Sequence, residues 1–323
     1  MDTRRGIGYG VAAYVMWGLV PLFWPLLQPA GAIELLSHRF VWSLLLMVIL
    51  IVALRRVRPT LALLRDRRKA LLLAVAAVTI TSNWGFYIWG VNSGRVVETS
   101  LGYFINPLVS IAMGVLIYRE RLRRLQWVAL AVAVAAIAIL TIDYGHVPWL
   151  ALVLAFSFGT YGLVKKAAGA GAFDSLAVET AYVAPLALAY LIWLGGRGHF
   201  SGSSGHMLLF AATGVVTALP LICFGAAATR VPMVTLGLLQ YLAPILQFII
   251  GVAIRHEPMS TGRWLGFAIV WLALALFAYD AVRAARSVRL PGVLVGSPAG
   301  DLAGQLARSE GGDGDLLEDV AQG

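Results

Sequence analysis

Long apolar runs alternate with short polar or charged interruptions from residue 6 to residue 283. The hydrocarbon core of a bilayer takes about 20 mostly apolar residues per spanning α-helix, and the runs have about this length. The pattern predicts an all-α integral membrane protein with about ten transmembrane helices. Their expected ranges are residues 6–27, 34–54, 69–91, 96–118, 124–142, 148–167, 176–194, 206–228, 233–254 and 262–283.

The first apolar run has a second interpretation as a cleaved signal peptide. Arg4 and Arg5 precede it, and residues 30–32 are small, as at a cleavage site. Cleavage would leave nine spans. Two tryptophans and two prolines interrupt the run, and the short apolar core of an ordinary signal peptide lacks these. A spanning helix is therefore the favoured interpretation.

Composition supports a membrane protein, and it gives the net positive charge an explanation other than nucleic acid binding. The 323-residue chain is 60% hydrophobic and 13% charged, and its mean hydropathy is +0.82. Its formal net charge of +9 would also suit a nucleic acid partner. Most of the Lys and Arg residues, however, lie in interruptions that are cytoplasmic when both termini are cytoplasmic. We expect a multi-pass protein of the plasma membrane, the inner membrane in bacteria, with both termini inside and no nucleic acid partner.

An internal repeat groups the spans into two halves. Three side chains recur in the second half at one offset of 137 residues, and five helices per unit, an odd number, invert the second unit. We expect a first repeat at residues 1–145, an inverted second repeat at 146–286, and a disordered cytoplasmic tail at 287–323. Inverted repeats are typical of secondary transporters whose substrate site lies near the bilayer midplane. The recurring pairs are Pro107 and Pro244, Glu120 and Glu257, and Trp127 and Trp264.

Three long stretches carry a family resemblance: NWGFYIWGVNSGRVVETSLGYFINPL at residues 83–108, IELLSHRFVWSLL at 33–45, and TALPLICFGAAATRVPMVTLGLLQYLAPILQF at 217–248. They closely resemble the RarD branch of the EamA, or drug/metabolite transporter, superfamily. The resemblance covers residues 6–283. It implies ten helices in inverted five-helix halves, a central cavity and transport of small metabolites or drugs. The branch name, chloramphenicol-sensitive protein, does not establish a substrate.

Arg39 is the first candidate for a functional side chain because it lies inside the second predicted span. A charge at mid-membrane costs about 2.5–3.5 kcal/mol on insertion scales and usually faces a partner or a watery cavity. The alternative is snorkelling to the outer interface, since Arg39 stands only about 10 Å along the helix. Glu34 and His38 share a helical face beside Arg39. They are candidates for a gate, a proton site or an anion site, against an interfacial position for Glu34 and a packing role for His38.

Polar and aromatic side chains supply the remaining candidates. Asn83 and Tyr87 share one face of the third span with Gly90, where they line a cavity or bind a neighbouring helix. A proline frees a backbone carbonyl, so we expect helix breaks, or packing kinks, at Pro107 and Pro244. The expected substrate-binding or pathway residues are His38, Arg39, Asn83, Tyr87, Tyr103, Asn106, Tyr161, Tyr241 and Gln247.

These features predict a secondary transporter, an exporter or exchanger, that moves small organic metabolites or drugs by alternating access through a central cavity. Its expected partners are this solute and the lipid bilayer, and its oligomeric state is open. No Lys follows a Gly, which excludes a Gly-Lys phosphate loop for ATP. No carboxylate stands plainly at mid-span, so the sequence indicates no proton relay. Glu120 and Glu257 are flanked by arginines, and we expect them in local ion pairs.

Two other classes are the alternatives. An intramembrane enzyme needs a nucleophile with a base or a metal cluster, but the five histidines contain no i,i+4 pair and Cys223 is the only cysteine. We therefore expect no catalytic residue, no metal site and no cofactor. A non-transporting assembly factor or receptor would be favoured by a separate recognition module, and the sequence shows none.

Overall fold

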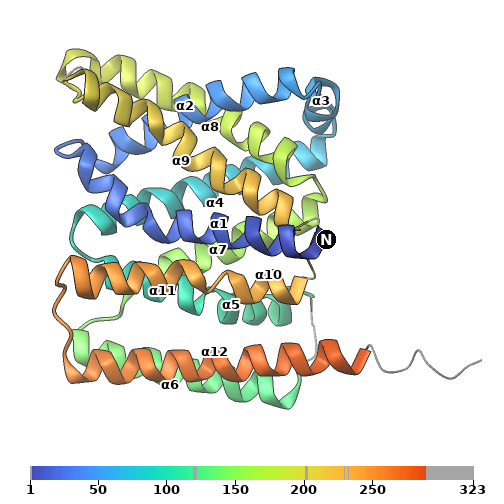
Figure 1. Ribbon diagram of the computed structural model, residues 1–323, viewed down its shortest axis with the longest axis vertical. Coiled ribbons are helices and arrows are strands. Elements are labelled where there is room, and N and C mark those ends of the chain that lie inside the picture. The colour runs from blue at the N-terminus through green and yellow to red at the C-terminus, as the bar shows by residue number, and fades with distance from the viewer. Residues whose placement is uncertain (1, 119–121, 201–202, 229, 232, 289–323) are drawn as a thin grey trace, which may run out of the picture. The chain divides into compact units, whose positions relative to one another are not determined.

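The predicted spans are helical in the computed structural model, except that residues 233–254 form three successive helical segments (Figure 1). The structure describes residues 2–118, 122–200, 203–228, 230–231 and 233–288. The first repeat contains α1 (Asp2–Phe23), α2 (Ala32–Ala53), α4 (Arg67–Asn92), α5 (Val96–Tyr118) and α6 (Arg124–Tyr144). The second contains α7 (Trp149–Ala168), α8 (Ala172–Leu194), α9 (Ser204–Ala228), α10 (Met233–Leu239), α11 (Leu242–Ile249) and α12 (Thr261–Val288). Short helices are η1 (Trp24–Leu27), α3 (Val57–Arg65), η2 (Gly195–Arg197) and the π-helical η3 (Ile250–Ile254).

Membrane-spanning length is a property of most of these helices. Among the described residues, eight helical segments are long and apolar enough to cross a membrane, and Trp149–Lys165 of α7 is a shorter apolar helix. The chain is therefore an all-α, multi-pass membrane protein. It separates into a compact unit, Met1–Asp280, and a second unit, Ala281–Gly323. The expected disordered tail lies outside the described residues from residue 289, and its first two residues belong to α12.

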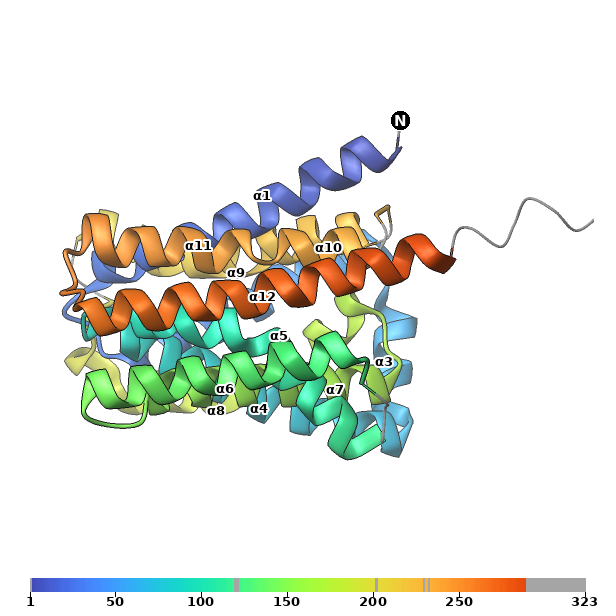
Figure 2. The same ribbon diagram turned by 90° about the horizontal axis from the view of Figure 1, so that it is seen from below.

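The two repeats interlock within Met1–Asp280. Helix α4 packs on α7, and the repeat-related pair α9 and α1 also packs together. Helix α2 contacts α9, just as α8 contacts α4, and α2 and α8 contact each other. Each of these contacts between a helix of one repeat and a helix of the other thus has a counterpart between the two equivalent helices. This is expected for two copies of one five-helix unit. Figures 1 and 2 show the last helices of the two repeats, α6 and α12, side by side.

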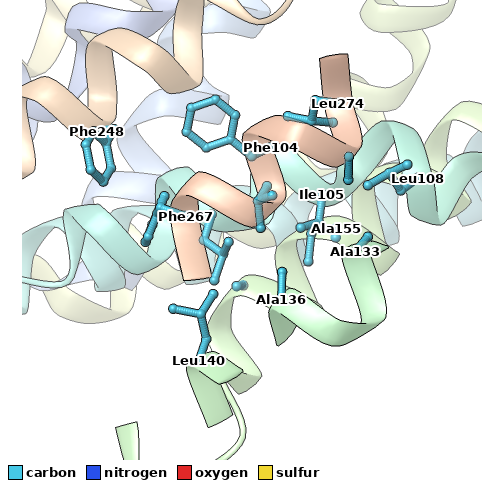
Figure 3. Close-up of a cluster of buried hydrophobic side chains, with 14 of the residues drawn as sticks. Phe104, Ile105, Leu108, Ala133, Ala136, Leu140, Ala155, Phe248, Phe267 and Leu274 are labelled. Carbon is cyan, nitrogen blue, oxygen red and sulfur yellow. The ribbon is translucent and has the colours of Figure 1, made fainter. Parts of the chain in front are cut away.

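The largest apolar cluster joins both repeats through α5, α6, α7, α11 and α12 (Figure 3). The rings of Phe248 and Phe267 lie 4.6 Å apart between centroids. A Cβ atom added to Gly266 would stand 2.4 Å from Leu140, so glycine is needed where α12 approaches α6. Close packing of this kind replaces the hydrophobic effect, which does not drive helices together inside lipid.

The two repeat-related prolines differ in their effect on the backbone. The helix is interrupted at Gln240 and Tyr241, between α10 and α11. Pro244 contributes to this interruption because it has no N–H to donate to the carbonyl of Gln240. Helix α5, by contrast, continues through the buried Pro107. The expectation of a break at Pro107 is therefore wrong, because a helix packed among other helices tolerates one missing hydrogen bond.

Candidate functional site

Arg39 is buried in α2 with only 7% of its surface exposed, which contradicts snorkelling to the interface. Its guanidinium lies over the indole of Trp84, 3.6 Å from the ring centroid, and 5.6 Å from the centroid of Trp24. No carboxylate among the described residues forms an ion pair with it, and its Nε has no hydrogen-bond partner. Stacking on a desolvated indole stabilises the guanidinium by about 2 kcal/mol. It does not supply a negative counter-charge.

Asn83 joins three helices next to this cation. Its Nδ2 donates to the carbonyl of Leu154 and to the Oγ of Ser157 on α7, both at 2.9 Å. Its Oδ1 accepts a 3.0 Å hydrogen bond from the hydroxyl of Tyr103 on α5. The side chain is fully buried in α4, so its face points inward as the helical spacing predicts.

Tyr87 completes the group. Its ring meets that of Tyr103 edge-on at 5.6 Å between centroids, and its buried hydroxyl has no hydrogen-bond partner among the described residues. Both phenols lie near the guanidinium of Arg39. We call Arg39, Asn83, Trp84, Tyr87 and Tyr103 the Arg39 cluster. It combines an unpaired cation, aromatic faces and an unpaired hydroxyl, which are groups that recognise small organic ligands.

The other expected pathway residues are distributed over both repeats. Asn106 is buried in α5, in the turn that follows Tyr103. Gln247 on α11 donates from Nε2 to the carbonyl of Trp17 on α1 at 3.2 Å, while its Oε1 is buried without a partner. Tyr241, just before α11, packs its ring against the apolar cluster that joins both repeats. The contact between α1 and α11 therefore holds an unsatisfied amide oxygen, that of Gln247, among the described residues.

Glu34 and His38 serve separate contacts instead of forming a pair. The backbone N–H of His199 donates to Glu34 Oε1 at 2.6 Å, and the imidazole Nδ1 lies 2.9 Å from Oε2. His38 packs between the rings of Phe200 and Phe210, with centroid distances of 5.0 and 4.5 Å. Glu34 thus ties the start of α2 to the loop between α8 and α9.

Glu179 is a buried carboxylate that the sequence pattern misses. It is 1% exposed, and it accepts hydrogen bonds from Lys165 Nζ at 2.7 Å and from the Tyr161 hydroxyl at 3.0 Å. Lys165 also donates to Ser175 Oγ. Because α8 begins at Ala172, four residues before the expected span, Glu179 lies well inside the helix. Glu179 is thus the eighth of the 23 residues of α8, short of mid-span, and its pairing with Lys165 is what the expected span boundaries did not indicate.

Glu257 caps a helix of the opposite repeat. Its carboxylate oxygens accept the backbone N–H groups of Val96 at 2.5 Å and Val97 at 2.8 Å, at the start of α5. Burial raises the pKa of Glu257, although the two amides act in the opposite direction. The expected ion pair with Arg255 is not formed within the described chain, because the carboxylate oxygens face these amides. Glu120, the repeat-related residue, lies outside the described residues.

Two hollows lie among the loops at one end of the helices. The larger, about 550 Å³, is lined by residues that include Arg95, Glu98, Tyr144, Glu257 and Arg263. The smaller, about 350 Å³, lies between the α1–α2 loop and the end of α4. Arg39 lines neither of them. The Arg39 cluster is therefore separated from both hollows in this conformation.

Comparison with known proteins gives the family. The EamA-like transporter family matches residues 4–142 and again residues 147–279. The chain belongs to this family. Protein RarD of Streptomyces exfoliatus is 56% identical over 291 residues, which cover 89% of this chain and 92% of that protein. The uncharacterized transporter YojE of Bacillus subtilis is 42% identical, over 87% of this chain and 96% of that protein.

The wider relatives place the chain in the RarD branch of the family. The chloramphenicol-sensitive protein RarD of Pseudomonas aeruginosa is 32% identical over 90% of this chain and 99% of that protein. A crystal structure of a protein that is 17% identical covers 86% of this chain and 99% of its own, with a TM-score of 0.58. That structure supports the fold alone. Family and relatives together make this chain a membrane transporter.

Proposed function

We propose that the protein is a secondary transporter, an exporter or exchanger, that carries small organic metabolites or drugs through the Arg39 cluster by alternating access. We place it in the plasma membrane with both termini cytoplasmic, as the charge distribution favours. The observation that carries the proposal is the buried guanidinium of Arg39, which has no anionic partner within the described residues.

The chemistry of the cluster indicates the kind of solute. A buried charge is unfavourable unless it is paired, and a carboxylate or similar anionic group of a solute would supply the missing partner through charge-assisted hydrogen bonds. The rings of Trp84, Tyr87 and Tyr103 offer flat apolar surfaces to the organic part of the molecule. Zwitterionic and anionic organic molecules fit both features.

The position of the cluster supports alternating access. Its residues come from α2, α4 and α5 of the first repeat, and Asn83 is bonded to α7 of the second. Neither of the two hollows reaches Arg39, and we propose that a solute gains access to it when helices of the two repeats move relative to each other. Inverted repeats permit such a movement toward either side of the membrane. Glu34 and His38, at the α8–α9 loop, are the proposed gate of that end.

The test is uptake by liposomes that contain the full-length protein. Vesicles are incubated with a ¹³C-labelled cell extract, and the retained solutes are identified by mass spectrometry. We expect specific solutes in protein-containing vesicles and not in empty ones. Arg39→Gln should reduce their uptake at least tenfold, and Arg39→Lys should reduce it less because the charge is kept.

Arg197→Gln is the matched control, because Arg197 also lies over an indole, 4.7 Å from the centroid of Trp193, but is exposed. It should transport like the wild type. Equal retention by empty and protein-containing vesicles would count against transport. Wild-type uptake by Arg39→Gln would show that the solute binds elsewhere. Chemical conversion of a solute would instead favour the intramembrane enzyme.

A further inference from the structure

Glu179 occupies in the second repeat the position that Arg39 occupies in the first. Helices α2 and α8 are the second helices of their repeats, and each residue stands seven positions after the first helical residue, Ala32 or Ala172. At 1.5 Å per residue both lie about 10 Å along the helix. Because the repeats are inverted, the two side chains enter the bundle from opposite ends. A cation and a carboxylate thus stand at equivalent positions.

The titratable groups that face Glu179 come from one neighbouring helix. Within the described chain they are Lys165 and Tyr161, both on α7. Helix α2 meets α8 with apolar side chains such as Met47, and α4 does so with Leu73. At the start of α8, Arg56 is bound to Asp174. Protonation of Glu179 therefore acts mainly on its contacts with α7.

One face of α7 connects Glu179 to the Arg39 cluster. Ser157, Tyr161 and Lys165 follow one another at intervals of four residues, so they share a side of the helix. Ser157 accepts the hydrogen bond of Asn83, and the other two bind Glu179.

Aromatic packing follows the same route. The ring of Phe158 lies 6.1 Å from that of Tyr103 and 5.9 Å from that of Tyr161, between ring centroids. The face of α7 that carries Lys165 is therefore in contact with both Asn83 and Tyr103, through Ser157 and Phe158.

We propose that Glu179 is a proton-binding site whose occupancy moves α7 and so couples proton movement to solute movement through the Arg39 cluster. The coupling rests on the proposed function, whereas proton binding does not. The proton comes from the aqueous phase and forms an O–H bond on one carboxylate oxygen, while Lys165 keeps its own protons. The neutral acid loses its ionic attraction to Lys165, which is 18% exposed and turns toward water. The tie between α7 and α8 is then weakened.

Proton binding is tested with dicyclohexylcarbodiimide, an apolar reagent that modifies protonated carboxylic acids within membranes. The acid proton moves to a carbodiimide nitrogen as the carboxyl oxygen bonds to the central carbon. The full-length protein in liposomes is treated at pH values from about 5 to about 9, and adducts are located by peptide mass spectrometry. We expect an adduct on Glu179 that increases as the pH falls and that Glu179→Gln abolishes.

Two variants show whether the neighbours set this proton affinity. Lys165→Gln removes the opposite charge and should give half-labelling at a roughly tenfold lower proton concentration. Tyr161→Phe removes one hydrogen bond, keeps the ion pair and should shift half-labelling in the same direction by less. Glu98 is the matched control carboxylate, since it is 3% exposed and bound to Arg95, far along the chain from Lys165. Its labelling should be the same in all variants.

Coupling is tested in the uptake assay with and without an imposed pH gradient. The ratio of the two uptakes should differ from one in the wild type and equal one in Glu179→Gln. A ratio of one in the wild type would overturn coupling, and so would an unchanged ratio in the variant. If no vesicle takes up solute, the proposed function fails while labelling still decides the proton site. Labelling of Glu179 that is absent, or unaffected by pH and by both variants, would overturn the proton site itself.

Discussion

Asn83 carries three hydrogen bonds to two other helices from a single side chain. Asn83→Ala leaves the hydroxyl of Tyr103 without its acceptor. Ser157 still donates to the carbonyl of Val153 at 2.6 Å. Interhelical hydrogen bonds in membranes contribute about 0.6–2 kcal/mol each. We expect Asn83→Ala to lower the free energy of unfolding by about 1–3 kcal/mol, measured by thermal unfolding in detergent.

Ser82→Ala is the control for this variant, because Ser82 is exposed on the same helix and bonds only to the carbonyl of Val78. It should unfold like the wild type. Equal stabilities of the two variants would show that Asn83 does not hold α4, α5 and α7 together.

At the scale of single residues, a functional side chain can be recognised in the sequence when it differs in polarity from its neighbours along the chain. Arg39 and Asn83 interrupt apolar runs, and the structure buries both. Glu179 stands near the edge of its run, and its partner Lys165 belongs to another helix, so neither its burial nor its pairing has a local signature. Glu257 has Arg255 two residues before it, which indicated an ion pair, but the backbone amides that it binds, such as that of Val97, leave no trace in a sequence pattern.

Helix α5 depends on a carboxylate outside its own segment for its N-terminal cap. Glu257→Ala removes the acceptor of two backbone N–H groups, and loss of a cap costs about 0.5–2 kcal/mol. Thermal unfolding should therefore show a lower midpoint, and Glu257→Gln, which keeps one acceptor, should lose less. Exchange of the amide hydrogens of Val96 and Val97 should accelerate in the Ala variant.

The raised pKa of Glu257 adds a pH signature to this prediction. Because the folded protein holds the proton more tightly than the unfolded chain, this contribution to stability is complete below the ordinary pKa of 4.5. It is lost as the pH rises through the raised value. Glu257→Gln should remove that part of the pH dependence. Identical pH profiles for wild type and Glu257→Gln would contradict the assignment.

Element boundaries were predictable where they coincide with a change in hydropathy, and less so elsewhere. The apolar runs located the spans, but α3 has neither the length nor the composition of one. Its Thr60 bonds Asp174 Oδ1 at 3.0 Å, and Arg56, just before it, bonds the same carboxylate. A long-range contact therefore stabilises this helix. The effect of Pro107 on α5 likewise depends on the helices packed around it, so the general rule that proline interrupts a helix could not predict it.

In the whole molecule, the two repeats are tied together at equivalent positions at both ends. Glu34 and Asp174 are each the third residue of the second helix of a repeat. Glu34 binds His199 in the loop before α9, and Asp174 binds Arg56 in the loop between α2 and α3. The inverted pattern was predictable from the recurring residues. The ties were not, because they join segments more than a hundred residues apart.

These ties lead to a prediction about alternating access. Under the proposed function, breaking the tie at one end favours opening at that end, and the inverted repeats make the other end close. Glu34→Gln should therefore favour access from the His199 end, and Asp174→Asn access from the Arg56 end. The reporter is a single cysteine in place of Gln247, with Cys223 replaced by serine.

Membrane-impermeant maleimide is applied to one side of sealed vesicles at a time. Glu34→Gln should raise labelling of the cysteine from the side of the α8–α9 loop and lower it from the other side, and Asp174→Asn should do the reverse. A change of a few-fold corresponds to about 1 kcal/mol between the two conformations. If both variants raise labelling from the same side, the ties only stabilise the fold. Opposite changes would show that equivalent positions in the two repeats control the two ends of one pathway.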